Sequence, residues 1–325
     1  MFKIIEKRKI WMSFSGLLVA VSIVAIVVFG LRLGIDFTGG SLMEISFSQE
    51  RPSNEAVVSA LSDFQLNNVY VQPTGDNGLL IRTDSLDEEK HQQVLAKLKD
   101  EFATPIDSEL PTSDQENIET EGLEVDLTNQ QFNEVTEERF DSIGPTIGAE
   151  LRSKALTAII LVLLAIILYL AYAFRKVSKP VPSWQYGVSA VIALAHDILI
   201  VIGIFAFLGY FFDVTIDAFF VTALLTILGF SVHDTIVTFD RIRENIFRYQ
   251  DKTFAEVINA SINETIIRSL NTSITTLIVL IAIMIFGGES IKFFILALVL
   301  GIIAGTYSSI FIACPLLYQF FRLKK

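Results

Sequence analysis

Asp234 is an ionisable side chain within a stretch that otherwise has the composition of a membrane-spanning helix. The apolar run ends soon after it in a dense cluster of charges, so the carboxylate is expected at membrane depth. An ionised side chain there costs roughly 2.5–3.5 kcal/mol on insertion scales, and such residues usually mark an ion path or a paired structural site. Asp234 is therefore a candidate proton carrier, and a purely structural hydrogen bond between helices is the alternative.

A second carboxylate, Asp197, lies near the middle of the preceding apolar stretch. His196 precedes it in the sequence, just as His233 precedes Asp234. Neighbouring residues on a helix point about 100° apart, so such a His–Asp pair cannot hold a metal from one face. We expect no metal, and each histidine is expected either to donate a hydrogen bond between helices or to relay protons.

Polar residues surround Asp234 along its own stretch and the next one. Ser231 and Thr238 flank it at three and four residues' distance, and together they predict a polar stripe that lines a path. Arg268 opens the following stretch, with Asn271 about one turn later. The two stretches run antiparallel, so Arg268 can pair with Asp234 and make proton binding depend on their separation. The alternative for Arg268 is an anchor that snorkels to the membrane surface.

These residues lie in or beside stretches that the sequence predicts to be membrane spans. The chain has 325 residues, of which 52% are hydrophobic, and its mean hydropathy is +0.53, which is too apolar for a soluble protein of this length. A span needs about 20 apolar residues. Six stretches qualify, at 10–30, 155–174, 186–209, 218–238, 270–287 and 292–314. The first is expected to be an anchor rather than a cleaved signal peptide.

Basic residues predict the orientation, because cytoplasmic loops retain Lys and Arg. All four basic clusters, before the first stretch, after the second and the fourth, and at the C-terminus, fall on one side. Both termini are therefore expected in the cytoplasm, with 1–30 as N-terminus and first span, 31–152 outside, and 153–325 as the remaining spans. Residues 31–152 carry 25 acidic and 8 basic side chains, a net charge of −17, against +6 for the rest, which argues against nucleic-acid binding.

The external segment has the pattern of a small α+β domain. Alternating strands are predicted at 42–47, 69–74 and 79–83, with helices at 53–64, capped by Ser53, and at 86–102. A further strand around 132–138 would complete a split β-α-β, ferredoxin-like module. Residues 104–128 read as a flexible acidic insertion. The predicted fold class is an α-helical polytopic membrane protein, with six transmembrane helices and this small external domain. Cys314 is the only cysteine, so burial alone must hold the domain together.

Two further patterns lie among the last spans. Residues 240–268 are too polar to cross a membrane, and they predict an amphipathic cytoplasmic helix at its surface. A four-residue repeat of small side chains marks the final stretch: Ala297, Gly301, Gly305 and Ser309. Small residues let helices approach closely, so we expect this stripe to pack against another helix, within the chain or in a partner.

Several motifs resemble the SecD and SecF accessory subunits of the bacterial protein-export translocase. LRLGIDFTGGSLMEISF at 31–47 is similar to their entry motif, and HDTIVTFDRIREN at 233–245 and IIRSLNTSITT at 266–276 are similar to SecF spans four and five. Six spans with one small external domain match the SecF branch of the family. The family-motif residues are Gly34, Asp36, Phe37, Gly39 and Gly40 in the first segment and Asp240, Arg241, Arg243, Glu244 and Asn245 in the second.

The resemblance implies a member of the RND superfamily in the bacterial inner membrane. Such a subunit pairs with SecD, assists the SecYEG channel and the translocating polypeptide, and uses the proton-motive force, with Asp234 as the proton-path carboxylate and Arg268 as its partner. Two rivals stay open, namely an RND-type exporter of lipid or small molecules and a passive scaffold of the translocase. No nucleotide-binding loop or nucleophile motif is present in the sequence, so we expect neither an enzymatic reaction nor a cofactor.

Overall fold

The computed structural model describes residues 2–103, 134–175 and 180–323, and these divide into two compact units. The helical unit comprises Met1–Phe37 and Glu150–Lys325, and the α+β unit comprises Thr38–Ala149. The acidic insertion predicted at 104–128 lies outside the described residues.

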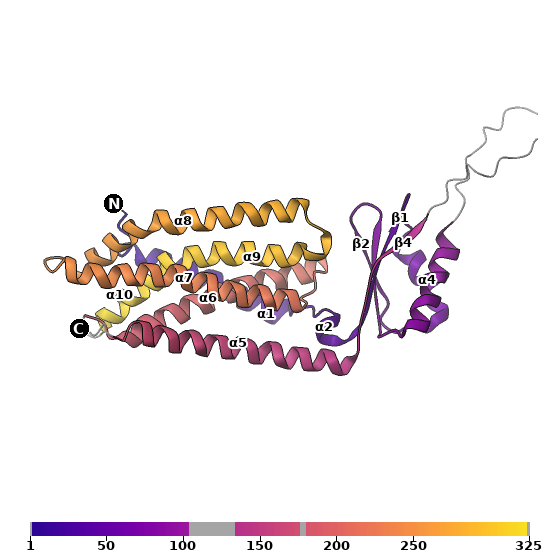
Figure 1. Ribbon diagram of the computed structural model, residues 1–325, viewed down its shortest axis with the longest axis horizontal. Helices are drawn as coiled ribbons and strands as arrows, with labels where there is room; N and C mark the ends of the chain where they lie inside the picture. The colour runs from indigo at the N-terminus through magenta and orange to yellow at the C-terminus, as the bar shows by residue number, and fades with distance from the viewer. Residues whose placement is uncertain (1, 104–133, 176–179, 324–325) are drawn as a thin grey trace, which may run out of the picture. The chain divides into compact units, whose positions relative to one another are not determined.

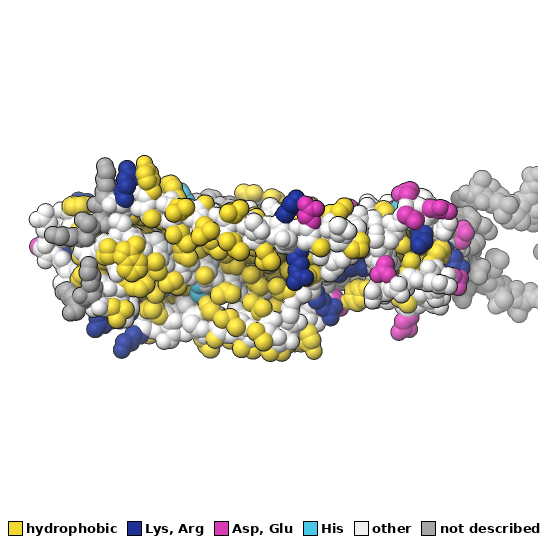
Figure 2. Space-filling view, turned by 90° about the horizontal axis from the view of Figure 1, so that it is seen from below, with side chains coloured by type: hydrophobic (Ala, Val, Ile, Leu, Met, Phe, Trp, Pro, Cys, Tyr) yellow, Lys and Arg dark blue, Asp and Glu magenta, His cyan; other side chains and the backbone are white. Residues whose placement is uncertain are grey.

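Six helices of the helical unit are long and apolar enough to cross a membrane, which confirms the predicted number of spans. They run side by side in Figure 1. The first five are α1 (Arg8–Phe29), α5 (Pro145–Ala173), α6 (Ser183–Phe212), α7 (Ala218–Arg248) and α8 (Phe254–Phe286). The sixth combines α9 (Glu289–Ser308), a π-helical turn (Ser309–Ala313) and α10 (Cys314–Leu323). Figure 2 shows hydrophobic side chains across much of the visible face of this unit, as expected of a surface that meets lipid.

The six helices are buried to very different degrees. In the most apolar part of the last span 72% of the residues are buried within the chain, against 6% in α5 and 17% in α8. Helices α6, α7 and α9 therefore form the interior of the unit, and α5 and α8 present long faces to whatever surrounds it. Polar side chains on α6, α7 and α9 consequently have to find partners within the chain.

The separate amphipathic helix expected over 240–268 is not formed. Helix α7 continues to Arg248 and α8 begins at Phe254, so a short loop joins them. Two ion pairs at i,i+3 spacing, Asp240–Arg243 and Arg241–Glu244, favour continued helix through the charge cluster. Thr253 and Glu256 then form a capping box that starts α8. The polar residues thus lengthen the two apolar helices instead of forming an element of their own.

The α+β unit has the predicted split β-α-β topology. Its strands are β1 (Gly40–Phe47), β2 (Tyr70–Thr74), β3 (Gly78–Thr83) and β4 (Val135–Ile143), and its helices are α3 (Asn54–Ala60) and α4 (Glu88–Phe102). The antiparallel sheet has the order β2-β3-β1-β4. Ser53 caps α3 as predicted, but the helix ends early and a 3₁₀ turn (Ser62–Phe64) follows.

The core of this unit lies on one face of the sheet. Alternate residues of β1, among them Ile45, point to this face, where they meet Val57 of α3 and Leu98 of α4. All three side chains are fully buried, and burial of one such side chain contributes about 1.5–3 kcal/mol. Apolar burial therefore stabilises the unit without a disulfide, since the chain's one cysteine, Cys314, lies in the other unit.

Candidate functional site in the helical unit

Asp197 is the centre of a buried polar cluster that joins three helices. Its Oδ2 accepts hydrogen bonds from the hydroxyls of Ser231 on α7, at 2.6 Å, and Ser308 on α9, at 2.7 Å. Its Oδ1 lies 3.0 Å from Nδ1 of His196, the preceding residue on α6. The Asp197 side chain has no exposed surface. A carboxylate enclosed this completely needs such partners, because an unpartnered buried charge is strongly destabilising.

The cluster extends from His196 toward α1. The imidazole ring lies 6.2 Å from the ring of Tyr307 on α9, whose hydroxyl is 3.0 Å from the Ser15 hydroxyl on α1. His196 is buried, and among the described residues its Nε2 has no hydrogen-bond partner. This histidine therefore contacts a carboxylate of its own helix, and the interhelical hydrogen bond expected from the sequence is not formed.

Close packing of α9 on α7 brings Ser308 within reach of Asp197. A Cβ atom added at Gly301 would lie 2.2 Å from the Ile227 side chain, and one added at Gly305 would lie 2.8 Å from the Ser231 side chain. The predicted stripe of small residues thus faces α7 of the same chain, and its ends, Ala297 and Ser309, are fully buried. The stripe has a positioning role, because larger residues would hold the α9 hydroxyl away from the carboxylate.

Asp234 has a different environment one turn further along α7. Asp234 is 3% exposed, and the Ser269 hydroxyl of α8 lies near its carboxylate. Its Oδ2, in contrast, is buried without a partner among the described residues. His233, the preceding residue, is exposed on the outside of α7. Asp234 thus has an oxygen that is free to take a proton.

The predicted pairing of Asp234 with Arg268 is not formed in the structure. Arg268 is exposed, and it makes no ion pair with any described residue. The reason is the direction of the side chain, since Ser269 faces Asp234 and the residue before it on a helix points about 100° away. Arg268 therefore shares an outer face of α8 with Asn271, whose side chain is also exposed.

The polar stripe predicted on α7 is divided among three partners. Ser231 binds Asp197, whereas the Thr238 hydroxyl lies 3.2 Å from the Asp234 backbone carbonyl oxygen and 3.5 Å from the Thr265 hydroxyl. All of these side chains are buried. The stripe therefore makes separate contacts, to Asp197 through Ser231 and to α8 through Thr238.

The charged family motif at the end of α7 fastens that helix to α8. Glu264 of α8 accepts hydrogen bonds from Nε of Arg241 at 2.5 Å and from the side-chain amide of Asn245 at 2.9 Å. The same amide also donates to the Ser261 hydroxyl. Arg241 and Asn245 are four residues apart and hence on one face of α7, a spacing that signals a common acidic partner. Sequence reasoning did not identify Glu264, Ser269 or Ser308, because each depends on how its helix is rotated about its own axis.

The glycine-containing family motif has two roles in the structure. Asp36 accepts a hydrogen bond from the backbone N–H of Ala218, the first residue of α7, at 2.6 Å, and Phe37 is buried beside it. Gly39 has a positive φ of 76°, and a Cβ there would lie 2.7 Å from Cα of Pro145. Gly40, with φ 128°, then opens β1. The motif therefore combines an anchor at α7 with a turn that only glycine tolerates.

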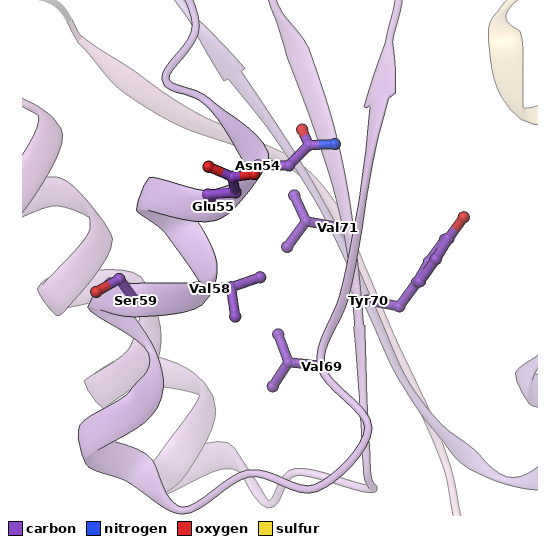
Figure 3. Close-up of a pocket in the computed structure, with 7 residues that line it drawn as sticks. All are labelled: Asn54, Glu55, Val58, Ser59, Val69, Tyr70 and Val71. Carbon is purple, nitrogen blue, oxygen red and sulfur yellow. The ribbon is translucent and has the colours of Figure 1, made fainter.

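An open groove lies in the α+β unit between α3 and the edge strand β2 (Figure 3). Its lining residues are Asn54, Glu55, Val58, Ser59, Val69, Tyr70 and Val71. Glu55 is the only carboxylate among them, so the groove has no set of converging groups for acid–base chemistry. No cluster of three or more His, Cys, Asp or Glu side chains that could hold a metal occurs in the parts of the chain that the structure describes.

Comparison with known families gives two matches. Residues 124–322 match the family described as "Protein export membrane protein SecD/SecF, C-terminal", and residues 24–50 match the SecD/SecF GG motif. The first covers most of the helical unit, and the second contains the Asp36 anchor and the glycine turn.

Relatives of the whole chain and a solved structure show the same similarity. The chain is 42% identical to the protein translocase subunit SecF of Thermobaculum terrenum, over 98% of this chain and 93% of that one. It is 38% identical to the SecF subunit of Anaerolinea thermophila, over 97% and 92%. The crystal structure of SecDF, a translocon-associated membrane protein from Thermus thermophilus, superposes with a TM-score of 0.77 at 28% identity. That match covers 98% of this chain but only 38% of the longer SecDF chain.

Proposed function

We infer the function of the chain from its family, for it belongs to the SecD/SecF family of protein export membrane proteins. We propose that it acts as a SecF-type subunit, that it pairs with a SecD-type partner, and that together they assist export through the SecYEG channel. The similar SecDF structure supports the pairing, because this chain corresponds to 38% of a chain that carries both names. The driving force in this proposal is the proton-motive force, and no chemical reaction is catalysed.

The observation that carries the proposal is the environment of Asp234. It is a buried carboxylate in a candidate membrane span, with the Ser269 hydroxyl nearby and with its Oδ2 lacking a partner among the described residues. Such residues are costly at membrane depth and mark ion paths. We assign proton binding and release to Asp234 and a more enclosed position on the proton path to Asp197, whose carboxylate accepts a hydrogen bond from Ser231 of α7.

In this proposal Arg268 reaches Asp234 by rotation of α8, whereas His233 already lies beside it on α7. Arg268 is adjacent to Ser269, so turning α8 by about 100° would replace the hydroxyl that faces Asp234 with a guanidinium. A cation close to the carboxylate favours release of the proton, and its withdrawal favours rebinding. His233 is exposed beside Asp234 and would exchange protons with the outer face of α7. Alternation between these two arrangements is the gate that we propose.

We further propose that both termini face the cytoplasm and that the α+β unit is external, as the basic residues predict. Within the helical unit, Figure 1 shows both termini at the same end as the α7–α8 loop, which fits this orientation. The N-terminus is fixed there, because the side-chain oxygen of Asn259 on α8 accepts hydrogen bonds from the backbone of Ile4 and Ile5.

Labelling of single cysteines tests the orientation. Cys314 is fully buried, so the native chain provides a silent background. We expect Asn77→Cys, on the exposed β2–β3 turn, to react with an impermeant thiol reagent on intact cells, and Asp251→Cys, in the α7–α8 loop, to react only in opened cells. The reverse pattern would overturn the orientation.

Asp234→Asn tests the proton-carrier role. The amide is nearly isosteric but cannot ionise, so the variant should assemble with its partner and yet lose the stimulation of export by a proton gradient. Export of a reporter preprotein into inverted vesicles, with and without an imposed gradient, measures the loss. Full gradient-dependent stimulation by an assembled Asp234→Asn subunit would support the scaffold alternative instead. An exporter of lipid or small molecules would show gradient-dependent transport without a SecD-type partner.

A further inference from the structure

The segment before the α+β unit is fastened to the start of α7 by a series of contacts. Gly34 donates a backbone hydrogen bond to the Ile216 carbonyl oxygen at 2.7 Å, and the Ile216 N–H returns one to the Arg32 carbonyl oxygen at 2.9 Å. The chain thus forms a short parallel bridge, Leu33 with Ile216, on the loop that joins α6 to α7. A Cβ on Gly34 would lie 3.0 Å from the Ile216 carbonyl oxygen, so glycine permits this approach.

Side chains continue the attachment on both sides of the bridge. Arg32 forms an ion pair with Asp213, which occupies a left-handed conformation with φ 56° at the end of α6. Asp36 accepts the hydrogen bond from Ala218 at 2.6 Å, and Asp217, the N-cap of α7, accepts from the Phe220 N–H in the same turn. A carboxylate that accepts from a helix N-terminal N–H forms one of the stronger protein hydrogen bonds.

Helix α7 leads from this attachment to Asp234, and a short connection leads from it to the α+β unit. Helix α7 is continuous from Ala218 to Arg248 and includes Asp234, which lies about 24 Å along the helix from its start. On the other side, only Phe37 separates Asp36 from Thr38, the first residue of the α+β unit. Gly39 then fixes the turn into β1 against Pro145.

We propose that residues 32–36 are a latch that transmits movement of α7 to the α+β unit, with Asp36 as its positioning residue. A shift or rotation of α7 moves the Ala218 N–H, and the latch carries that displacement into β1 through a three-residue connection. The proposal rests on the proposed function, because it assigns to Asp234 the event that moves α7. It goes further in naming the route by which a proton site inside the membrane acts on a domain outside it.

Two pairs of spin labels test the latch in the full chain, reconstituted with its SecD-type partner. One pair, Thr222→Cys with Gly288→Cys, reports on α7 within the helical unit. The other, Asn77→Cys with Gly288→Cys, reports on the α+β unit relative to the helical unit. In the native protein both distance distributions should change between pH 8 and pH 6, and Asp234→Asn should abolish both changes.

Asp36→Ala should separate the two signals. We expect the first pair to respond as in the native protein, the second to stop responding, and gradient-stimulated export to fall to the level of Asp234→Asn. Asp36→Asn keeps an oxygen acceptor for the Ala218 N–H and should restore both. The matched control is Asp87→Ala, which removes another carboxylate that accepts from an N–H in the first turn of a helix, here the Lys90 N–H of α4 at 2.9 Å, and it should leave both signals intact.

A second variant keeps the test decisive if Asp36→Ala does not accumulate. Insertion of Gly-Ser after Thr38 leaves the latch contacts in place and makes only the connection to β1 longer and more flexible. The distance of the second pair should then stop responding to pH, and gradient-stimulated export should fall, as in Asp36→Ala. Native export and a native response of the second pair, in Asp36→Ala or in the insertion variant, would overturn the latch. A pH response that persists in Asp234→Asn would instead overturn the proton-carrier role, so the two failures are distinguishable.

Discussion

Asp197 and Asp234 are the same residue type in the same helical unit, yet their surroundings differ. Both oxygens of Asp197 are occupied, by hydroxyls from α7 and α9 and by its own neighbouring histidine. Asp234 has only the Ser269 hydroxyl nearby, and its Oδ2 has no partner among the described residues. The first carboxylate lies among the interior helices, whereas the second lies between α7 and the largely exposed α8.

This difference shows how one bundle gives two carboxylates separate tasks. A fully hydrogen-bonded carboxylate holds its neighbours in place, because any change of protonation would break at least one of its contacts. A partly bonded carboxylate carries a free energy cost that binding of a proton relieves. On the proposed function, fixed packing around Asp197 supplies a stable frame, and Asp234 is the position at which protons bind and leave.

The largest effect is expected from a substitution that separates α9 from α7, because it removes the Ser308 contact from Asp197 and leaves Asp234 untouched. Gly301→Leu would place a side chain where even a Cβ lies 2.2 Å from Ile227, and overpacking of this kind costs about 1–3 kcal/mol or more. We expect loss of folded protein, because the Ser308 hydroxyl could no longer reach Asp197. Gly229→Leu on α7 is the control, since nothing lies within 4 Å of a Cβ there. Normal accumulation and partner binding of Gly301→Leu would show that the close approach is dispensable.

Features that depend on composition and spacing could be predicted from the sequence, whereas those that depend on helix rotation could not. Apolar length and the four-residue repeat of small side chains identified the spans and the stripe that packs on α7, because both depend only on composition and spacing. Strand alternation likewise predicted the topology of the α+β unit. The rotation of each span about its axis is set by contacts between helices, and polar residues occur on several sides of α8, so spacing alone does not tell which of them faces α7. The sequence therefore placed Arg268 beside Asp234 when the structure places Ser269 there.

Removal of each carboxylate in turn compares the two sites directly. Asp197→Ala leaves the Ser231 and Ser308 hydroxyls without their acceptor, and interhelical hydrogen bonds in membranes contribute about 0.6 kcal/mol on average and at most about 1.7 kcal/mol. We therefore expect a loss of about 1–2 kcal/mol. Asp234→Ala should be neutral or stabilising, because it removes a buried oxygen that has no partner among the described residues.

Thermal unfolding of both variants in the same detergent measures this contrast, read as a difference in apparent Tm because such unfolding is rarely reversible. Asp197→Asn serves as the intermediate, since its side-chain carbonyl oxygen still accepts one hydroxyl. Equal destabilisation by Asp197→Ala and Asp234→Ala would mean that both carboxylates are structural.

Ser269→Ala has a small expected effect on stability and the sharpest effect on function. Its hydroxyl lies near the Asp234 carboxylate, and an interhelical hydrogen bond in a membrane contributes about 0.6 kcal/mol on average. Proton binding at Asp234 should nevertheless change, because a hydroxyl that donates to a carboxylate favours its ionised form. We expect the midpoint of gradient-stimulated export, measured against pH, to move while the apparent Tm stays within error of the native value. Ser308→Ala is the matched control on the other carboxylate, and it should lower the apparent Tm without moving the midpoint. If the two serine variants exchange these effects, the carboxylate that titrates is Asp197, and the assignment of the two sites has to be reversed.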